Sequence, residues 1–104
     1  MAPAKRTKRK AKAEIAAAEA RQRIDRWLWH ARIVKTRTLA ASLVASGHVR
    51  VNGRRAESPA HAVQKDDILT IALLSRVRVL RVADFSGRRG GAALAITLYE
   101  EIKA

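Results

Sequence analysis

The stretch from Arg23 to Gly53 constrains the fold most, because its hydrophobic spacing changes from that of helices to that of a strand. The i, i+3, i+4, i+7 spacing of a buried stripe predicts a first helix, with apolar residues at Ile24, Trp27, Leu28 and Ala31. A similar stripe predicts a second helix, with apolar residues at Leu39, Ala40, Leu43 and Val44. We therefore expect two short amphipathic helices at the centre of the fold.

The ends of these helices and the turn after them carry clear local signals. Thr36 stands where an N-cap of the second helix is expected, and Gly47 stands where a helix closes in a left-handed conformation. Residues 49–51 alternate between valine and arginine, which predicts a strand. The dipeptide Asn52-Gly53 is the strongest short hairpin signal, so a tight turn should follow that strand.

The rest of the chain predicts a small, mostly antiparallel sheet under the helices, so the fold class is α+β. Further elements are expected as strands at 54–56, 68–73 and 76–82, a loop at 84–91 and a helix at 92–102. Alanine-rich residues 11–23 favour nascent helix, and the first helix is expected to extend backward into them. The predicted divisions are a basic arm (1–22, disordered or nascent helix), a central domain (23–72) and a C-terminal strand and helix extension packed on it (73–104).

The charge of the chain points to a polyanionic partner. Its 104 residues include 22 Lys and Arg against 9 Asp and Glu, for a formal net charge of +13. A short chain this basic usually meets nucleic acid, with an anionic membrane surface as the next possibility. Cysteine is absent, which fits a reducing cytosol, and no run approaches the roughly 18 apolar residues of a membrane span. No secretory signal is expected at the start.

The start of the second helix is the sharpest candidate site. A helix N-terminus offers unpaired backbone N–H groups and a partial positive charge, so it binds phosphate readily at a residue such as Thr36. Lys35 and Arg37 flank that position, and Arg32 lies one turn before it. The alternative is that Thr36 only caps the helix and the cations are solvated.

The predicted hairpin is the second candidate site. Arg50, Arg54 and Arg55 surround one turn, and opposed arginines on a ribbon repel each other unless an anion lies between them. A charge run is often only a solvated face. Three arginines around one turn nevertheless favour contact with a polyanion.

The two tryptophans have different expected roles. Trp27 falls on the apolar stripe, so packing in the core is favoured over base stacking. Trp29 lies roughly 100° away from that stripe by helical spacing. It is expected to pack under the C-terminal helix, against Leu94 or Leu98, with exposure for base stacking as the alternative.

No residue pattern points to catalysis, a cofactor or a metal. Asp25 is expected to pair with a neighbouring arginine, because no second carboxylate, Ser-His-Asp set or thiol accompanies it. The three histidines lack the spacing of metal ligands and are expected at the surface or satisfied locally. The segment SGRRGG lacks the Lys-Ser/Thr of a phosphate-binding loop. A plain flexible loop is favoured there over a weak RNA contact.

The sequences RIDRWLWHARIVKTR and SGHVRVNG resemble the S-four type RNA-binding domain, also called the alpha-L motif. That resemblance covers about residues 23–71. Within the superfamily the two segments look most like the ribosome-associated heat shock protein fifteen family, a likeness that continues through Arg88-Arg89 to residues 98–101. Two departures are visible: Glu57-Ser58-Pro59 stands where the family often has a lysine, and the basic extension lies at the N-terminus instead of the C-terminus.

The resemblance implies an S-four-like (alpha-L) fold and a set of RNA contacts. The expected RNA-binding residues are Arg23, Arg26, Arg32, Lys35, Thr36, Arg37, Arg50, Asn52, Arg54 and Arg55. Secondary RNA contacts are expected at Lys8, Arg9, Lys10, Arg88 and Arg89. The basic arm is then a segment that gains order on RNA, with a plain solubilising tail as the alternative.

The resemblance also implies a function. We expect a non-enzymatic, cytoplasmic, monomeric protein that docks on ribosomal RNA of the large subunit, with peptidyl-tRNA as a further partner. Its role would be the recycling of large subunits that still carry a stalled nascent chain on tRNA. One alternative is an accessory RNA-binding subunit of an RNA-modifying enzyme. The other is a helix-turn-helix DNA-binding protein, against which the hairpin directly after the second helix argues.

Overall fold

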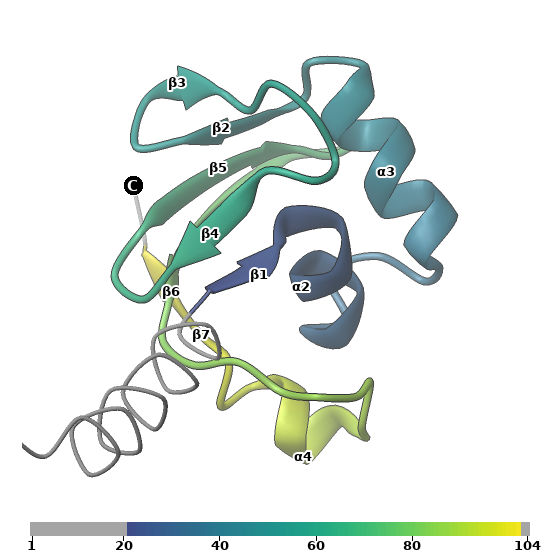
Figure 1. Cartoon of the computed structure of the whole chain (residues 1–104), viewed down its shortest axis with the longest axis vertical. Coiled ribbons are helices and arrows are strands. Elements are labelled where there is room, and N and C mark those ends of the chain that lie inside the picture. Colours follow the sequence, from purple (N-terminus) through teal and green to yellow (C-terminus); the bar gives the residue numbers. More distant parts are fainter. Residues whose placement is uncertain (1–20, 103–104) are drawn as a thin grey trace, which may run out of the picture.

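The computed structural model describes residues 21–102, in which two helices lie on one side of an antiparallel sheet (Figure 1). The elements in chain order are β1 (Arg21–Arg23), α2 (Ile24–His30), α3 (Arg37–Ala45), β2 (Val49–Val51), β3 (Arg54–Arg55), β4 (Ala62–Gln64), β5 (Ile68–Ala72), β6 (Val77–Val82), α4 (Ala92–Ala95) and β7 (Tyr99–Ile102). Five strands form one sheet in the order β3-β2-β5-β6-β7, while β1 and β4 pair as a separate ribbon. Every pairing is antiparallel, which confirms the predicted α+β class.

One hydrophobic core holds the helices to the sheet. Trp27 and Leu28 of α2 are fully buried, as the predicted apolar stripe requires. Alternate residues of β5 and β6 point into the same core, and Leu69 lies directly opposite Leu80 in the ladder. Burial of Trp27 confirms its expected place in the core.

The predicted caps of α3 are confirmed. The Thr36 hydroxyl oxygen accepts a hydrogen bond from the Leu39 N–H at 3.0 Å, in extended backbone geometry. At the other end Gly47 has φ +82°, and the His48 N–H reaches the Leu43 carbonyl at 3.0 Å to close the helix. A side chain at position 47 would be strained, because only glycine adopts such a backbone readily.

The tight turn between β2 and β3 is also confirmed. Asn52 and Gly53 have φ values of +51° and +84°, the left-handed pair that a two-residue hairpin of this type requires. The strands it joins place Val51 opposite Arg54 and Arg50 opposite Arg55. The chain therefore passes from α3 directly into a hairpin whose second strand is all arginine.

The predicted helix over residues 92–102 is wrong beyond its first turn. The helix α4 ends at Ala95, and Tyr99–Ile102 form the strand β7 on the edge of the sheet. Pairing with β6 gives the backbone of β7 a partner and brings Glu100 opposite Arg81. The β-branched and aromatic residues of the segment fit a pleated, half-buried surface better than a short amphipathic helix.

The backward extension of the first helix is also wrong. Residues Arg21–Arg23 form β1, which pairs with β4, and α2 begins at Ile24. The Ile24 N–H donates to the His61 carbonyl at 2.7 Å, and the Asp25 N–H donates to the Pro59 carbonyl at 3.3 Å. These N–H groups cannot also bond to a preceding helical turn, so the segment before them is extended.

Candidate nucleic-acid interface

Asp25 holds two of the predicted contact residues. Its carboxylate is buried (3% exposed) and accepts two hydrogen bonds from the Arg23 guanidinium, both at 3.1 Å. It also lies 3.7 Å from the Arg37 Nε and accepts the Arg26 backbone N–H at 2.7 Å. The expected pairing of Asp25 with an arginine is confirmed. The side chains of Arg23 and Arg37 remain 50% and 44% exposed, so each is anchored at one point and still accessible.

Arg32 stands at the end of α2 in an unusual backbone conformation. Its φ is +58°, and the Ile33 N–H returns to the Leu28 carbonyl at 3.0 Å, the same closure that α3 makes with a glycine. Its Nε donates to the Gly90 carbonyl at 2.9 Å. The arginine therefore uses one donor on the loop after β6, and the residue as a whole remains exposed.

The start of α3 keeps the features of a phosphate site. Thr36 fills one of the helix's unpaired donors with its own hydroxyl, while the N–H groups of Arg37 and Thr38 have no acceptor among residues 21–102. Lys35 is exposed beside them and makes no ion pair within that range. We name Arg23, Arg26, Arg32, Lys35 and Arg37 the helix cluster.

The hairpin presents a second group of cations. Arg50 and Arg55 face each other across the β2–β3 ladder, and both are exposed. Neither they nor Arg54 pair with a carboxylate in the described part of the chain. The Arg55 guanidinium lies over Gly47 and donates to the Ala45 carbonyl at 3.3 Å, so a cation rests at the C-terminus of α3. We name Arg50, Arg54 and Arg55 the hairpin cluster.

The two clusters lie toward opposite ends of α3 (Figure 1). The nine residues of that helix span about 13 Å at 1.5 Å per residue. A ligand touching both clusters must therefore be an extended polyanion and cannot be one small phosphate compound.

The side chain of Asn52 connects the hairpin to the residues at the start of β5. Its side-chain Nδ2 donates to Asp67 Oδ1 at 3.1 Å, and its Oδ1 accepts the Ile68 N–H at 2.9 Å. Both ends of the amide are occupied, so Asn52 fixes the hairpin against β5. Its expected contact with RNA stays a prediction.

The arginines of β6 form a contrast with both clusters. Arg78 donates two hydrogen bonds to Glu101, at 2.9 and 2.7 Å, and lies over the Tyr99 ring. This pairing raises the pKa of Arg78 and lowers that of Glu101. Arg81 pairs with both Asp66 and Glu100. Acidic residues thus neutralise the arginines of β6, whereas in the two clusters only Arg23 and Arg37 have a carboxylate beside them within residues 21–102, that of Asp25.

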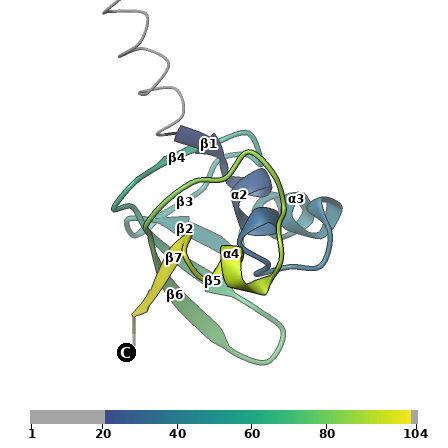
Figure 2. The ribbon, with the colours of Figure 1, turned by 90° about the horizontal axis from the view of Figure 1, so that it is seen from below.

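The loop after β6 is tied to α2, whereas the sequence favoured a plain flexible loop. Ser86 offers its carbonyl to Gln22 Nε2 at 2.8 Å and to His30 Nδ1 at 3.0 Å. Trp27 Nε1 donates to the Asp84 carbonyl at 3.0 Å. The side chains of Trp27, His30 and Gln22 therefore all bond to the carbonyls of residues 84–86, and we name these three contacts the clasp. Figure 2 shows this loop passing beside α2.

His30 is satisfied locally, as expected of the histidines. Only 1% of it is exposed, and burial lowers its pKa although the hydrogen bond to Ser86 works in the other direction. The charges of Arg26, Arg37 and Arg89 lower the pKa further. Because a carbonyl only accepts, the neutral ring must carry its proton on Nδ1.

The remaining predicted contacts divide into three groups. Arg89 donates to the Trp29 carbonyl at 3.1 Å, and its guanidinium lies 5.8 Å from the centre of the Trp29 ring. Trp29 is half-buried, and the cation beside its ring is Arg89. Arg88 is exposed on the loop. Lys8, Arg9 and Lys10 lie outside the described residues.

Residues 21–102 contain neither a candidate metal site nor a candidate membrane span. No group of three His, Asp or Glu side chains in this range could hold a metal ion. No helix in it is long and apolar enough to cross a bilayer.

Comparison with known proteins agrees with this geometry. The S4 domain model matches residues 22–69. A solved structure described as trimeric Vibrio cholerae Heat Shock Protein 15 superposes with a TM-score of 0.74 at 36% identity, covering 79% of this chain and 82% of that one. The Heat shock protein 15 homolog of Aeromonas salmonicida is 40% identical over 82 residues, and Heat shock protein 15 of Escherichia coli K12 is 38% identical over 79.

The fold and its basic helix pair define an S4-domain protein. The same domain also gives a shorter likeness, 37% identity over 49 residues, to Small ribosomal subunit protein uS4 of Saccharopolyspora erythraea. The chain belongs to the heat shock protein 15 family. It spans about 60% of the length of the first two curated relatives, 61% of the Aeromonas protein and 59% of the Escherichia one.

Proposed function

We propose that this protein binds RNA through the helix cluster and the hairpin cluster. The observation that carries the proposal is the separation of charge. Arginines on β6 are matched by carboxylates, whereas Arg26, Lys35 and Arg54 have no carboxylate partner among residues 21–102. Uncompensated cations at close spacing destabilise a fold unless an anion lies against them, so their grouping favours a polyanionic ligand.

The mechanism is recognition of RNA shape and phosphate, without chemistry. The open N–H groups of α3 and the flanking Lys35 take one phosphate, and the hairpin arginines take others beyond the opposite end of that helix, which is about 13 Å long. Such contacts fix the position of the protein on the RNA, and release of condensed cations supplies much of the affinity. The buried Asp25 sets the direction of Arg23 and Arg37 before RNA arrives.

The proposed RNA is ribosomal RNA of the large subunit. Family membership supports this choice, as does the S4 domain shared with a ribosomal protein. We further propose that the protein acts as a non-enzymatic, cytoplasmic monomer that recycles large subunits still holding a nascent chain on tRNA. Sedimentation across a ribosome gradient, with and without stalled nascent chains, tests this role. Co-purification with an RNA-modifying enzyme in place of large subunits would contradict it, as would a preference for duplex DNA in competition.

Two matched double variants test the binding surface. Lys35→Ala with Arg54→Ala removes one cation from each cluster, and Lys65→Ala with Arg76→Ala removes two exposed cations elsewhere. Both variants have the same net charge, so a general charge effect acts on them equally. We expect co-sedimentation with large subunits at about 150 mM salt to fall at least tenfold for the first pair and little for the second, because only the first pair loses phosphate contacts. Equal losses would contradict the assigned surface.

A further inference from the structure

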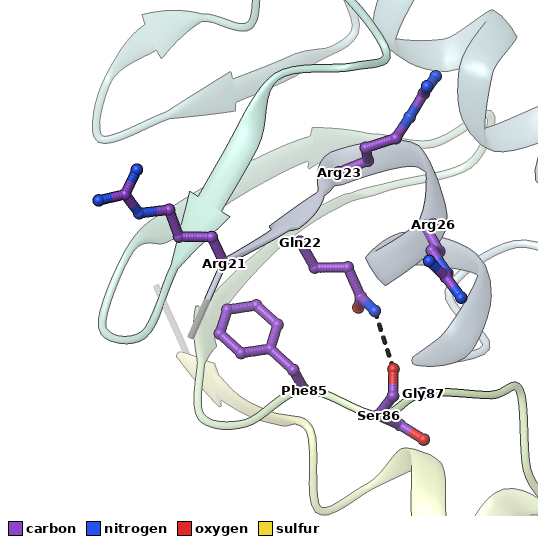
Figure 3. Close-up of a pocket in the computed structure, with 7 residues that line it drawn as sticks. All are labelled: Arg21, Gln22, Arg23, Arg26, Phe85, Ser86 and Gly87. Atoms are coloured by element: carbon purple, nitrogen blue, oxygen red, sulfur yellow. Dashed lines mark hydrogen bonds between the residues drawn. The ribbon is translucent and has the colours of Figure 1, made fainter. Parts of the chain in front are cut away.

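A pocket of about 460 Å³ opens between β1, the first turn of α2 and the loop after β6 (Figure 3). It is lined by Arg21, Gln22, Arg23, Arg26, Phe85 and Ser86. Its volume lies within the roughly 300–1,000 Å³ of typical ligand sites. Its loop residues lie beyond residues 22–69, so the pocket joins the S4 domain to the extension.

The charge of the lining selects an anionic occupant. Three arginines line the pocket and no carboxylate does. Arg23 is paired with Asp25, but Arg21 and Arg26 have no carboxylate partner in the region the structure covers. Figure 3 shows these two side chains on either side of Phe85 and Gln22. A phosphate at either edge of the pocket would therefore meet an available guanidinium group, that of Arg21 on one side or that of Arg26 on the other.

Phe85 adds an aromatic surface to this basic rim. It is the only phenylalanine in the chain, and it lies half-buried on a loop whose position is fixed on both sides. Its own N–H donates to Asp84 Oδ1 at 2.8 Å, and the next carbonyl, of Ser86, is held by Gln22 and His30. An aromatic ring beside arginines is the arrangement that proteins use to stack an unpaired base.

Gln22 supplies a polar atom that lacks a partner. Its Nε2 is fixed by the Ser86 carbonyl, and its Oε1 is buried without a hydrogen bond among the described residues. Because that oxygen is buried, an occupant of the pocket cannot reach it in this conformation. Gln22 therefore contributes through its amide N–H, which holds the loop that carries Phe85.

We propose that this pocket binds one unpaired nucleotide of the RNA, with its base against Phe85 and its two flanking phosphates at Arg21 and Arg26. The proposal rests on the proposed RNA binding and adds to it, because the two clusters read phosphate positions whereas this pocket would require a nucleotide outside a duplex. It predicts a preference for structured RNA that carries a bulge or an unpaired end next to a helix.

The test uses two RNA hairpins with one stem sequence, one fully paired and one with a single bulged 2-aminopurine nucleotide. Phe85→Leu keeps apolar packing but removes the stacking face, Phe85→Trp restores a ring, and Tyr99→Leu removes a ring elsewhere. We expect the unmodified protein to prefer the bulged RNA and to quench its fluorescence. Phe85→Leu should bind the bulged RNA about tenfold more weakly, with no change on the paired RNA. Phe85→Trp and Tyr99→Leu should behave like the unmodified protein.

The outcomes separate the two proposals. If the protein binds both RNAs equally well and Phe85→Leu changes neither affinity nor fluorescence, the nucleotide pocket is wrong while RNA binding stands. If the unmodified protein binds neither hairpin, the nucleotide pocket is wrong, and RNA binding is then judged by co-sedimentation with large subunits. A melting curve for Phe85→Leu shows whether it is folded. If it is not, the fluorescence of the bulged 2-aminopurine with the unmodified protein still decides, because unquenched fluorescence would contradict stacking on Phe85.

Discussion

At the scale of single residues, one buried carboxylate organises the helix cluster. Asp25 lies in the first turn of α2. Its carboxylate contacts the guanidinium groups of Arg23, just before that helix, and of Arg37, at the start of α3. Its value to binding is therefore positional. If Asp25 loses its charge, both arginines remain in the chain, but the carboxylate no longer holds their guanidinium groups close together.

Asp25→Asn separates position from charge. The change raises the net charge by one, so attraction to RNA through charge alone predicts tighter binding. We expect weaker binding, by about three- to tenfold, together with a loss of about 1 kcal/mol of unfolding free energy. Glu57→Gln is the control, because it also raises the net charge by one at an exposed position without an ion pair among residues 21–102. If Asp25→Asn binds RNA more tightly than Glu57→Gln, Asp25 has no positioning role.

At the scale of elements, local signals explain what the sequence predicted and what it did not. The caps at Thr36 and Gly47 and the Asn52-Gly53 turn depend on the conformations of those residues alone, so they could be read from the chain. The strands β1 and β7 form because strands that are distant in the sequence, β4 and β6, have backbone N–H and C=O groups free to pair with them. Arg21–Arg23 has no alternating hydrophobic pattern, and no local reasoning could have found that strand.

The clasp between α2 and the loop after β6 predicts how stability depends on pH. His30 donates to Ser86 as a neutral ring, and its pKa is lowered in the folded protein. The unfolded chain, with an ordinary histidine pKa of about 6.5, then binds more protons than the folded one. His30 therefore contributes stability that is present above about pH 6.5 and is lost as the pH falls below it.

Urea unfolding followed by tryptophan fluorescence between pH 8 and pH 5.5 measures this dependence. We expect the free energy of unfolding to fall over the acidic part of that range. His30→Gln should be less stable at pH 8 but should show a flatter profile, whereas the exposed His48→Gln should keep the original slope. A His30→Gln profile as steep as that of the unmodified protein would contradict the role of His30.

At the scale of the whole molecule, the predicted contact residues of the helices and the hairpin fall into two clusters, one toward each end of α3. The sequence singled out the members of both clusters as expected RNA contacts, but it could not show that Asp25 holds two of them or that α3 separates the groups. The pocket beside Phe85 also escaped prediction, because it joins β1 to a loop more than sixty residues away. Contacts this distant follow from the tertiary fold and leave no periodic signal.

The central claim is that both clusters bind phosphates of one RNA, and the salt dependence of affinity tests it most directly. Affinity for large-subunit ribosomal RNA is measured against salt for the unmodified protein, for Arg26→Ala with Lys35→Ala, for Arg50→Ala with Arg54→Ala, and for all four changes together. Each lost phosphate contact lowers the logarithmic slope by about 0.7–0.9. We expect each double variant to reduce the slope by about 1.5 and the quadruple variant by about 3. A slope that stays unchanged when either cluster is removed would contradict the claim.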